Sequence, residues 1–268
     1  MSSDPLRAPP GERSIASLLE FGVINLDKPP GPSAHQVSAW VKCLADLDRA
    51  AHAGTLDPKV TGVLPMLLGS ATRLVPALLE GHKEYVAVLE LHGTPPSDLE
   101  STVAAFEGEI YQKPPRKSAV KRRLRTREVY DLEVLEVQDR QALLRMAVES
   151  GTYVRKLCHD LGLALGTGAH MGDLRRTGTT PFDDTDLQTL HDLADALGRY
   201  EETGREDWLR EVVAPGERAL EHLPQVTIAP SAAREVAHGA PVYAPGVIDG
   251  PAEPPDGLVV CTTPDGAA

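Results

Sequence analysis

An isolated carboxylate is the first residue in this chain whose type and surroundings suit chemistry. Residues 52–69, HAGTLDPKVTGVLPMLLG, contain one acidic group, Asp57, and most of its neighbours are apolar or small. Apolar neighbours limit water, and this strengthens any interaction of the carboxylate with charge. Asp57-Pro58 also matches the start of a helix, because Asp is a favoured N-cap and Pro is favoured at the first helical position. The local sequence leaves a catalytic and a capping role open.

A strongly basic segment is the second candidate. Residues 113–127, KPPRKSAVKRRLRTR, contain no acidic residue, although the chain as a whole has a net charge of −12. The acidic total argues against general polyanion binding, whereas a basic segment on an acidic body suits a local phosphate contact. A solvated basic loop is the alternative. The basic residues are Lys113, Arg116, Lys117, Lys121, Arg122, Arg123, Arg125 and Arg127.

The residues that precede Asp57 predict a strand and a helix. FGVINLDK, residues 21–28, indicates a strand that ends in a rigid Pro/Gly turn. Residues 32–47 predict a helix, since Ser33 and Gln36 have capping-box spacing. The residues expected on its apolar face are Val37, Trp40, Val41 and Leu44.

The residues that follow Asp57 have an interrupted helical pattern. Apolar residues recur at helical spacing from Val60 to Leu78, but Pro65, Gly69 and Pro76 interrupt the pattern. The sequence therefore predicts short, broken helices here, with Ser70 capping a new helix.

The remaining strands and helices are predicted in blocks and do not alternate as regular βαβ units. KEYVAVLELHG, residues 83–93, predicts a strand, and residues 127–150 predict two strands with a turn near 138–140. TYVRKLCHDLGLALG, residues 152–166, predicts a helix, with Arg155 beside its apolar stripe and near its start. Residues 185–222 are mostly helical in pattern, and short strand-like pieces follow Pro224. This organisation predicts an α+β fold. The apolar stripe consists of Val154, Leu157, Cys158, Leu161 and Leu165.

Six local patterns occur along the chain in one order, and together they resemble a known family. The resemblance is to the pseudouridine synthases of the TruB/dyskerin family and covers about residues 20–245. GTLDPKVTG and PPRKSAVKRRLR look like the archaeal/eukaryotic dyskerin branch, whose enzymes are usually guided by H/ACA RNA. The six patterns are LDKPPGPSAHQV, HAGTLDPKVTGVL, KEYVA, QKPPRKSAVKRRLRTREVY, GTYVRKLCHDLG and HMGDLRRTGTTPF.

The resemblance implies a catalytic group of three residues. Asp57 would be the essential carboxylate, acting as a nucleophile or as the base for a sugar proton, while Arg155 would pair with it. Tyr85 would stack on a uridine flipped out of the RNA, and Leu174 would pack on the same base. Taken alone, Tyr85 is an ordinary strand aromatic, Arg155 a solvent-facing helical residue and Leu174 a core residue.

The resemblance also implies RNA-binding residues. His52 and Thr55, next to the catalytic loop, would touch the substrate, although His52 alone is more simply a structural residue. No metal and no organic cofactor are needed for the reaction, and the three cysteines show no zinc pattern. Arg175 and Arg176 would meet phosphates or the protein's own acids. The remaining expected contacts to the RNA backbone are Lys121, Arg122 and Arg123.

The implied architecture is a pseudouridine synthase fold with a mixed, largely antiparallel central sheet flanked by helices and loops. We expect an N-terminal tail over 1–14, a catalytic domain over 15–222 and a PUA-like RNA-binding β domain over 223–268. About 45 residues follow Pro224, so the final strands of a complete PUA barrel are expected to be missing or reduced.

The function implied by the resemblance is isomerisation of uridine to pseudouridine in rRNA or tRNA, as the catalytic subunit of an H/ACA guide ribonucleoprotein. Its partners would be guide RNA and small H/ACA proteins: a zinc-ribbon peptide, a Gly/Arg-related subunit and a kink-turn binder. The alternatives are guide-independent action on the T-arm of tRNA and a non-catalytic RNA scaffold. Lacking an apolar leader or spanning segment, the chain is expected to be soluble and cytoplasmic, without membrane contact.

Overall fold

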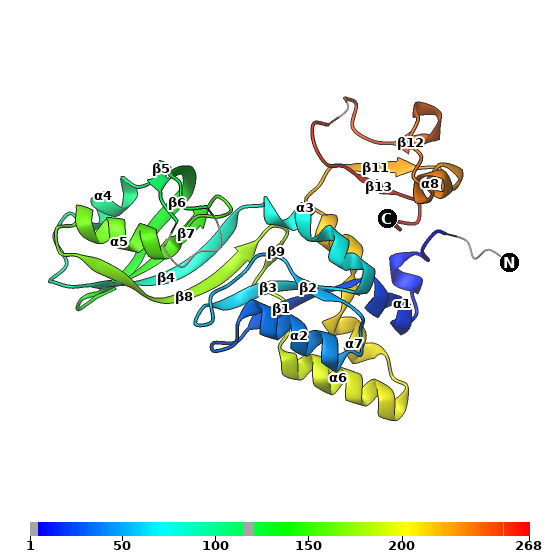
Figure 1. Ribbon diagram of the computed structural model, residues 1–268, viewed down its shortest axis with the longest axis horizontal. Coiled ribbons are helices and arrows are strands. Elements are labelled where there is room, and N and C mark those ends of the chain that lie inside the picture. Colours follow the sequence, from blue (N-terminus) through cyan, green and yellow to red (C-terminus); the bar gives the residue numbers. More distant parts are fainter. Residues whose placement is uncertain (1–4, 115–120, 254) are drawn as a thin grey trace.

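The computed structural model describes residues 5–114, 121–253 and 255–268, and most of its strands belong to one large mixed sheet (Figure 1). The order in this ten-stranded sheet is β10-β1-β3-β8-β4-β7-β6-β5, with β2 paired to β3 and β9 paired to β8. β3 and β8 run parallel, and the other pairings within the sheet are antiparallel. The predicted α+β class and the largely antiparallel sheet are confirmed. The strands are β1 Gly22–Lys28, β2 Ala50–His52, β3 Thr61–Leu68, β4 Lys83–Leu91, β5 Gly108–Gln112, β6 Arg125–Gln138, β7 Gln141–Val148, β8 Ala169–Thr179, β9 Phe182–Asp183 and β10 Ala214–Pro215.

Helices cover the two halves of the sheet with separate apolar cores. In one half, α2 and α6 pack on β1 and β3; in the other, α4 and α5 pack on the strands around β4 and β7. Tyr85 of β4 and Leu174 of β8 are half-buried and contact both cores. The junction of the two halves is therefore where these side chains meet the surface. The helices of this part of the chain are α1 Ile15–Glu20, α2 Ala34–Leu44, α3 Val75–Leu79, α4 Leu99–Ala104, α5 Val154–Ala164, α6 Leu190–Thr203 and α7 Asp207–Val212, with 3₁₀ helices over Pro10–Glu12, Gly69–Leu74 and Gly216–Leu220.

The predicted strand 21–28 and the helix near 33–44 are confirmed as β1 and α2. Ser33 caps α2 by accepting a hydrogen bond from the N–H of Gln36, whose side chain accepts one from the N–H of Ser33. The expected apolar face was partly wrong, since Trp40 and Leu44 are exposed. The buried positions of α2 are Ala34, Val37, Ser38 and Val41.

The short helices predicted after Asp57 were wrong for residues 61–68 but right for the residues that follow, which form a 3₁₀ helix over Gly69–Leu74 and helix α3 over Val75–Leu79. Residues Thr61–Leu68 form strand β3, which is buried along almost its whole length because α2 and α6 cover one face and a third core covers the other. A strand buried on both faces has a nearly continuous apolar sequence, so helical spacing is satisfied by chance. Ser70 caps no helix; its hydroxyl donates to the carbonyl of Glu20.

The later predictions agree better with the structure. β4, β6 and β7 occupy the predicted strand regions, and Asp139 has a left-handed backbone (φ 52°) in the tight turn between β6 and β7. All five residues expected on the apolar stripe of α5 are buried. The predicted helical character of 185–222 is confirmed by α6, α7 and the 3₁₀ helix Gly216–Leu220.

Residues after Pro224 form a second, three-stranded sheet in the order β12-β11-β13. Figure 1 shows it with α8 as a small lobe beside the large sheet. The division at residue 223 and the PUA-like nature of this lobe stay predictions. Its elements are β11 Gln225–Ile228, α8 Pro230–Ala237, a 3₁₀ helix over Ala244–Gly246, β12 Val247–Asp249 and β13 Val260–Thr262.

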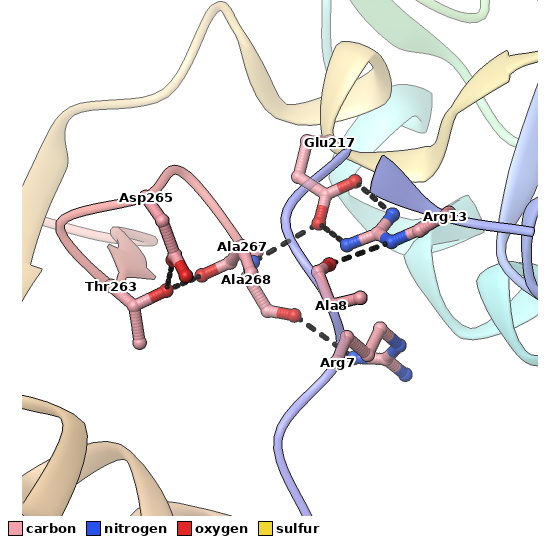
Figure 2. Close-up of polar contacts among 8 residues, drawn as sticks. All are labelled: Arg7, Ala8, Arg13, Glu217, Thr263, Asp265, Ala267 and Ala268. Atoms are coloured by element: carbon pink, nitrogen blue, oxygen red, sulfur yellow. Dashed lines mark hydrogen bonds and ion pairs between the residues drawn. The ribbon is translucent and has the colours of Figure 1, made fainter. Parts of the chain in front are cut away.

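Polar contacts join the N-terminal segment to the lobe (Figure 2). Arg13 is 1% exposed and forms two hydrogen bonds to Glu217, at 2.6 and 2.7 Å. Glu217 also accepts the N–H of Ala268, and Arg7 donates to the carbonyl of Ala268 at 2.9 Å. Thus, although predicted as a tail, residues 7–13 lie against the body of the protein. No helix in the described ranges is both long and apolar enough to cross a membrane.

Candidate active site

Asp57 lies in a loop between two strands, so the alternative of a helix cap does not apply. The loop joins β2 to β3, and its backbone turns where the N–H of Val60 donates to the carbonyl of Asp57 at 3.0 Å. Leu56 and Val60 are buried in the first core and anchor the loop on both sides of the turn. The carboxylate between them stays 54% exposed, so the loop is fixed while its acidic group points outward.

Lys28 holds this turn from below and was not singled out from the sequence. Its side chain is fully buried, and its ammonium group donates to the carbonyls of Pro29, Pro58 and Val60 at 2.8–2.9 Å. Burial lowers the pKa of Lys28, whereas the charge of Asp57 acts in the opposite direction. A lysine that ends an apolar strand just before a Pro-Pro turn was the available signal in the sequence.

Arg155 forms the ion pair with Asp57 that the resemblance implied. It is the second residue of α5, and its guanidinium donates to the carboxylate of Asp57. Because helix α5 is fixed by its buried stripe, this arginine is presented at a defined place above the loop. Exposed ion pairs contribute little to stability, so the pair is better suited to orienting the carboxylate than to holding the fold.

Tyr85 and Leu174 lie on the neighbouring strands β4 and β8, and Arg176, which interacts with Tyr85, also donates to the loop of Asp57. In the antiparallel pairing of β4 with β8, Tyr85 is opposite Arg176 and Ala87 is opposite Leu174. Residues directly opposite each other project to the same face of a sheet, so Tyr85 and Leu174 lie on one face. An aromatic ring and an aliphatic side chain on one face can frame a planar base between them.

The structure contradicts the expectation that Arg176 meets RNA phosphates. Arg176 is 1% exposed, and its guanidinium donates to the carbonyls of Val63 at 2.7 Å and Gly54 at 3.2 Å. Burial lowers its pKa, while its interaction with the Tyr85 hydroxyl acts in the opposite direction. Arg176 therefore supports the Asp57 loop and Tyr85 from inside the protein.

Arg175 lies on the opposite face of β8 and forms two hydrogen bonds to Asp27, at 3.0 and 3.1 Å. Of the two roles expected for it, the contact with one of the protein's own acids is the one observed. Since Asp27 immediately precedes Lys28, this ion pair also holds the segment that supports the loop.

His52 and Thr55 flank the loop in different environments. Thr55 is exposed, as a substrate contact would require, whereas His52 is half-buried and packs edge-on against His35 with 4.9 Å between ring centroids. Burial, His35 and Arg176 lower the pKa of His52, so the ring is neutral near pH 7. Its Nδ1 atom is buried and has no hydrogen-bond partner among the residues that the structure describes.

The basic segment is only partly described. Lys121, Arg122 and Arg123 are exposed just before β6, and Arg122 donates to the carbonyl of Pro114. Arg116 and Lys117 lie outside the described residues. Within the described ranges these three cations form no hydrogen bond or ion pair with the Asp57 loop, and their role in RNA binding stays a prediction.

The assembled group is chemically simple. One oriented carboxylate, one guanidinium, and an aromatic and an aliphatic side chain are suited to acid–base or nucleophilic work on a planar base. Among the described residues, no three His, Cys, Asp or Glu side chains are grouped as metal ligands.

Three sequence profiles match the chain in succession. The DKCLD (NUC011) domain matches residues 5–38, and the N-terminal domain of the TruB family of pseudouridylate synthases matches 42–98 and 92–154. The C-terminal domain of tRNA pseudouridylate synthase B matches residues 155–221. The profiles thus contain the loop of Asp57, Tyr85 and Arg155 in their order along the chain.

Similar proteins cover nearly the whole chain. A "Probable tRNA pseudouridine synthase B" of Halobacterium salinarum is 67% identical over 98% of this chain and 91% of its own length. A crystal structure of a Cbf5–Nop10–Gar1 complex contains a chain 50% identical, with a TM-score of 0.92, covering 100% of this chain and 82% of that one. A structure of an H/ACA RNP bound to a substrate RNA containing 2′-deoxyuridine gives 47% identity, a TM-score of 0.89 and coverages of 100% and 82%. The resemblance inferred from the sequence motifs is confirmed, and the chain belongs to the TruB family of pseudouridylate synthases.

Proposed function

We propose that this chain isomerises uridine to pseudouridine in RNA as the catalytic subunit of an H/ACA guide ribonucleoprotein. The observation that carries the proposal is the Asp57–Arg155 pair, set in a rigid loop beside Tyr85 and Leu174. The support for guided action is the likeness to chains solved in a Cbf5–Nop10–Gar1 complex and in an H/ACA RNP with substrate RNA.

The reaction places definite demands on these residues. The uridine must leave the RNA stack, which costs a few kcal/mol, and stacking on Tyr85 offsets about 1–3 kcal/mol of that cost. The C1′–N1 bond then breaks, the uracil turns, and C5 bonds to C1′. Asp57 acts at the sugar as nucleophile or base, Arg155 orients it, and Leu174 limits the space in which the free uracil turns.

The partners that we propose are those present in the similar solved structures. Guide RNA would bring the target uridine to Asp57, and small proteins of the Nop10 and Gar1 kinds would complete the particle. Lys121, Arg122 and Arg123 would contact the RNA backbone without reading its sequence. Because a similar chain was solved in an archaeal box H/ACA sRNP complex, and archaeal cells lack a nucleus, the location that we propose is the cytoplasm.

A reconstitution experiment tests the proposal. The purified chain is combined with Nop10- and Gar1-type proteins, a designed guide RNA and a substrate labelled with tritium at uridine C5, whose release reports isomerisation. We expect release that depends on the guide. Release from a tRNA transcript without guide would favour independent action on tRNA, the second candidate suggested by the names of its relatives. Guide binding without any release would favour a scaffold.

A further inference from the structure

Four cations are buried in the part of the chain that the structure describes, and three of them lie around the candidate site. Arg13, far from the site along the fold, is neutralised by Glu217. In the described ranges Lys28, Lys83 and Arg176 form no ion pair; each donates to backbone carbonyls instead. Burying a cation without a carboxylate is costly, so three such residues at one place need a reason.

Hydrogen bonds tie Lys28 and Arg176 to one loop, and Lys83 lies two residues before Tyr85 on β4, on the same face of the sheet. Lys28 donates to Pro58 and Val60, and Arg176 donates to Gly54, so both hold the loop that carries Asp57. Arg176 also interacts with Tyr85, and its positive charge lowers the pKa of Lys83. Lys83 is 5% exposed and donates to the carbonyl of Leu78 at 3.1 Å. We name Lys28, Lys83 and Arg176 the buried cation layer.

The inference rests on the proposed function and concerns the charge formed during the reaction. When the C1′–N1 bond breaks, the bonding pair stays with the uracil, which becomes an anion. At the sugar, Asp57 either bonds to C1′ or takes a proton from C2′. The uracil remains an anion until C5 bonds to C1′, when Asp57 leaves C1′ or returns the proton to C2′; the proton on C5 is then lost and N1 gains a proton. Positive charge that is fixed in a buried layer beside the reacting base stabilises such an anion without reorganisation of the protein. We propose that the positive charge of the buried cation layer, beneath Asp57 and Tyr85, stabilises the detached uracil anion.

Lys83 is the member whose charge can be changed by pH. Burial, and then the charge of Arg176, lower the pKa of Lys83 to about 8. Arg176 of β8 is the charged group that acts on it; α3 contributes the Leu78 carbonyl, and β7 places Val148 opposite it. On β4 itself the neighbouring titratable residues are His82, Glu84 and Tyr85, of which Glu84 is exposed.

The two consequences of deprotonating Lys83 have opposite signs. Between pH 8 and 10.5 the unfolded chain holds the lysine proton and the folded chain has released it, so stability rises with pH in this window. The rate of isomerisation should fall over the same rise in pH, because the layer loses one charge. A lysine with only a structural role would raise stability without lowering the rate.

The test uses the reconstituted particle and single-turnover rates of isomerisation, together with RNA affinity and melting temperature. At pH 7, Lys83→Met should slow the reaction about tenfold with unchanged RNA affinity, because one preorganised charge is lost. Lys83→Arg should stay within about threefold of the unchanged protein and should not slow between pH 7 and 9. Arg13→Met is the control, since it removes a buried cation remote from the site and should lower the melting temperature without lowering the rate.

The outcomes separate this inference from the proposed function. An unchanged particle that forms no pseudouridine contradicts the proposed function itself. If the particle with the natural sequence is active and the Lys83→Met particle reacts equally fast, the charge of the layer does not stabilise the uracil anion. The same conclusion follows if Lys83→Arg folds but reacts as slowly as Lys83→Met. If neither variant folds, the pH dependence of the isomerisation rate is measured with the natural sequence. A rate that falls from pH 7 to 9 supports the inference, and a rate that does not change with pH overturns it.

Discussion

Arg155 at the start of α5 pairs with Asp57, a residue 98 positions earlier in the chain, and both side chains stay more than half exposed. One comes from the helical layer over the second half of the sheet and the other from a loop of the first half. The ion pair thus spans the junction at which Tyr85 and Leu174 contact both cores.

Removing the arginine should separate catalysis from stability. Arg155→Ala should lower the isomerisation rate by about 100-fold or more, as expected when a group that orients a catalytic carboxylate is lost. The free energy of unfolding should change by less than about 1 kcal/mol, because exposed ion pairs are weak. Single-turnover kinetics and thermal unfolding of the same preparation check this. A variant that loses both would indicate a structural arginine.

Lys28 should behave in the opposite way. Lys28→Met removes the lysine donor from the carbonyls of Pro29 and Val60 and one of the two donors of the Pro58 carbonyl, so we expect a loss of about 2–4 kcal/mol in the free energy of unfolding. The rate should fall as well, because the turn after Asp57 loses its support. Denaturant unfolding gives the first quantity and single-turnover rates give the second. A Lys28→Met protein as stable as the unchanged one would refute the supporting role.

A substitution at Gly62 tests how closely strands β3 and β8 approach each other beneath the loop. It has φ +98°, and an added Cβ would lie 2.1 Å from the carbonyl oxygen of Arg176. Gly62→Ala should therefore destabilise the protein by about 3 kcal/mol or more. The matched control is Gly198→Ala in α6, where an added Cβ would meet no atom within 4 Å apart from the backbone of its own helix, and a gain of about 0.5–1 kcal/mol is expected. Equal melting temperatures for the two variants would contradict the described packing.

The exposed cations before β6 should act on RNA affinity alone. Replacing Lys121, Arg122 and Arg123 together by Gln should weaken guide RNA binding at low salt and reduce the salt dependence by about two to three counterions. Titrations at several salt concentrations measure this slope. The rate at saturating RNA should not change, and an unchanged slope would mean that these residues do not meet phosphates.

The sequence predicted the chemistry of the site better than its supports. The expected ion pair of Asp57 with Arg155 is present, and Tyr85 and Leu174 lie on one face of neighbouring strands, while the catalytic roles of these residues stay predictions. Arg176 was misassigned to RNA, since a basic residue in a polar motif looks the same whether its strand position faces water or a core.

The local fold around Asp57 was the main error. When one face of a strand is exposed to solvent, as in β7, polar and apolar residues alternate and the strand can be told from a helix. Strand β3 is covered on both faces, so this alternation is missing. Only the tertiary arrangement, with α2 and α6 on one side and the third core on the other, could show that residues 61–68 are extended. The supporting role of Lys28 was hidden for the same reason, because its three acceptors become neighbours only after folding.

The central claim is that the carboxylate of Asp57 performs the reaction, and Asp57→Asn in the reconstituted particle tests it most directly. The side chain keeps its size and is exposed, so the melting temperature should stay within about 2 °C of the unchanged protein. Tritium release from labelled uridine should fall to the background while RNA binding persists. Release at an undiminished rate by a folded Asp57→Asn protein would contradict the account.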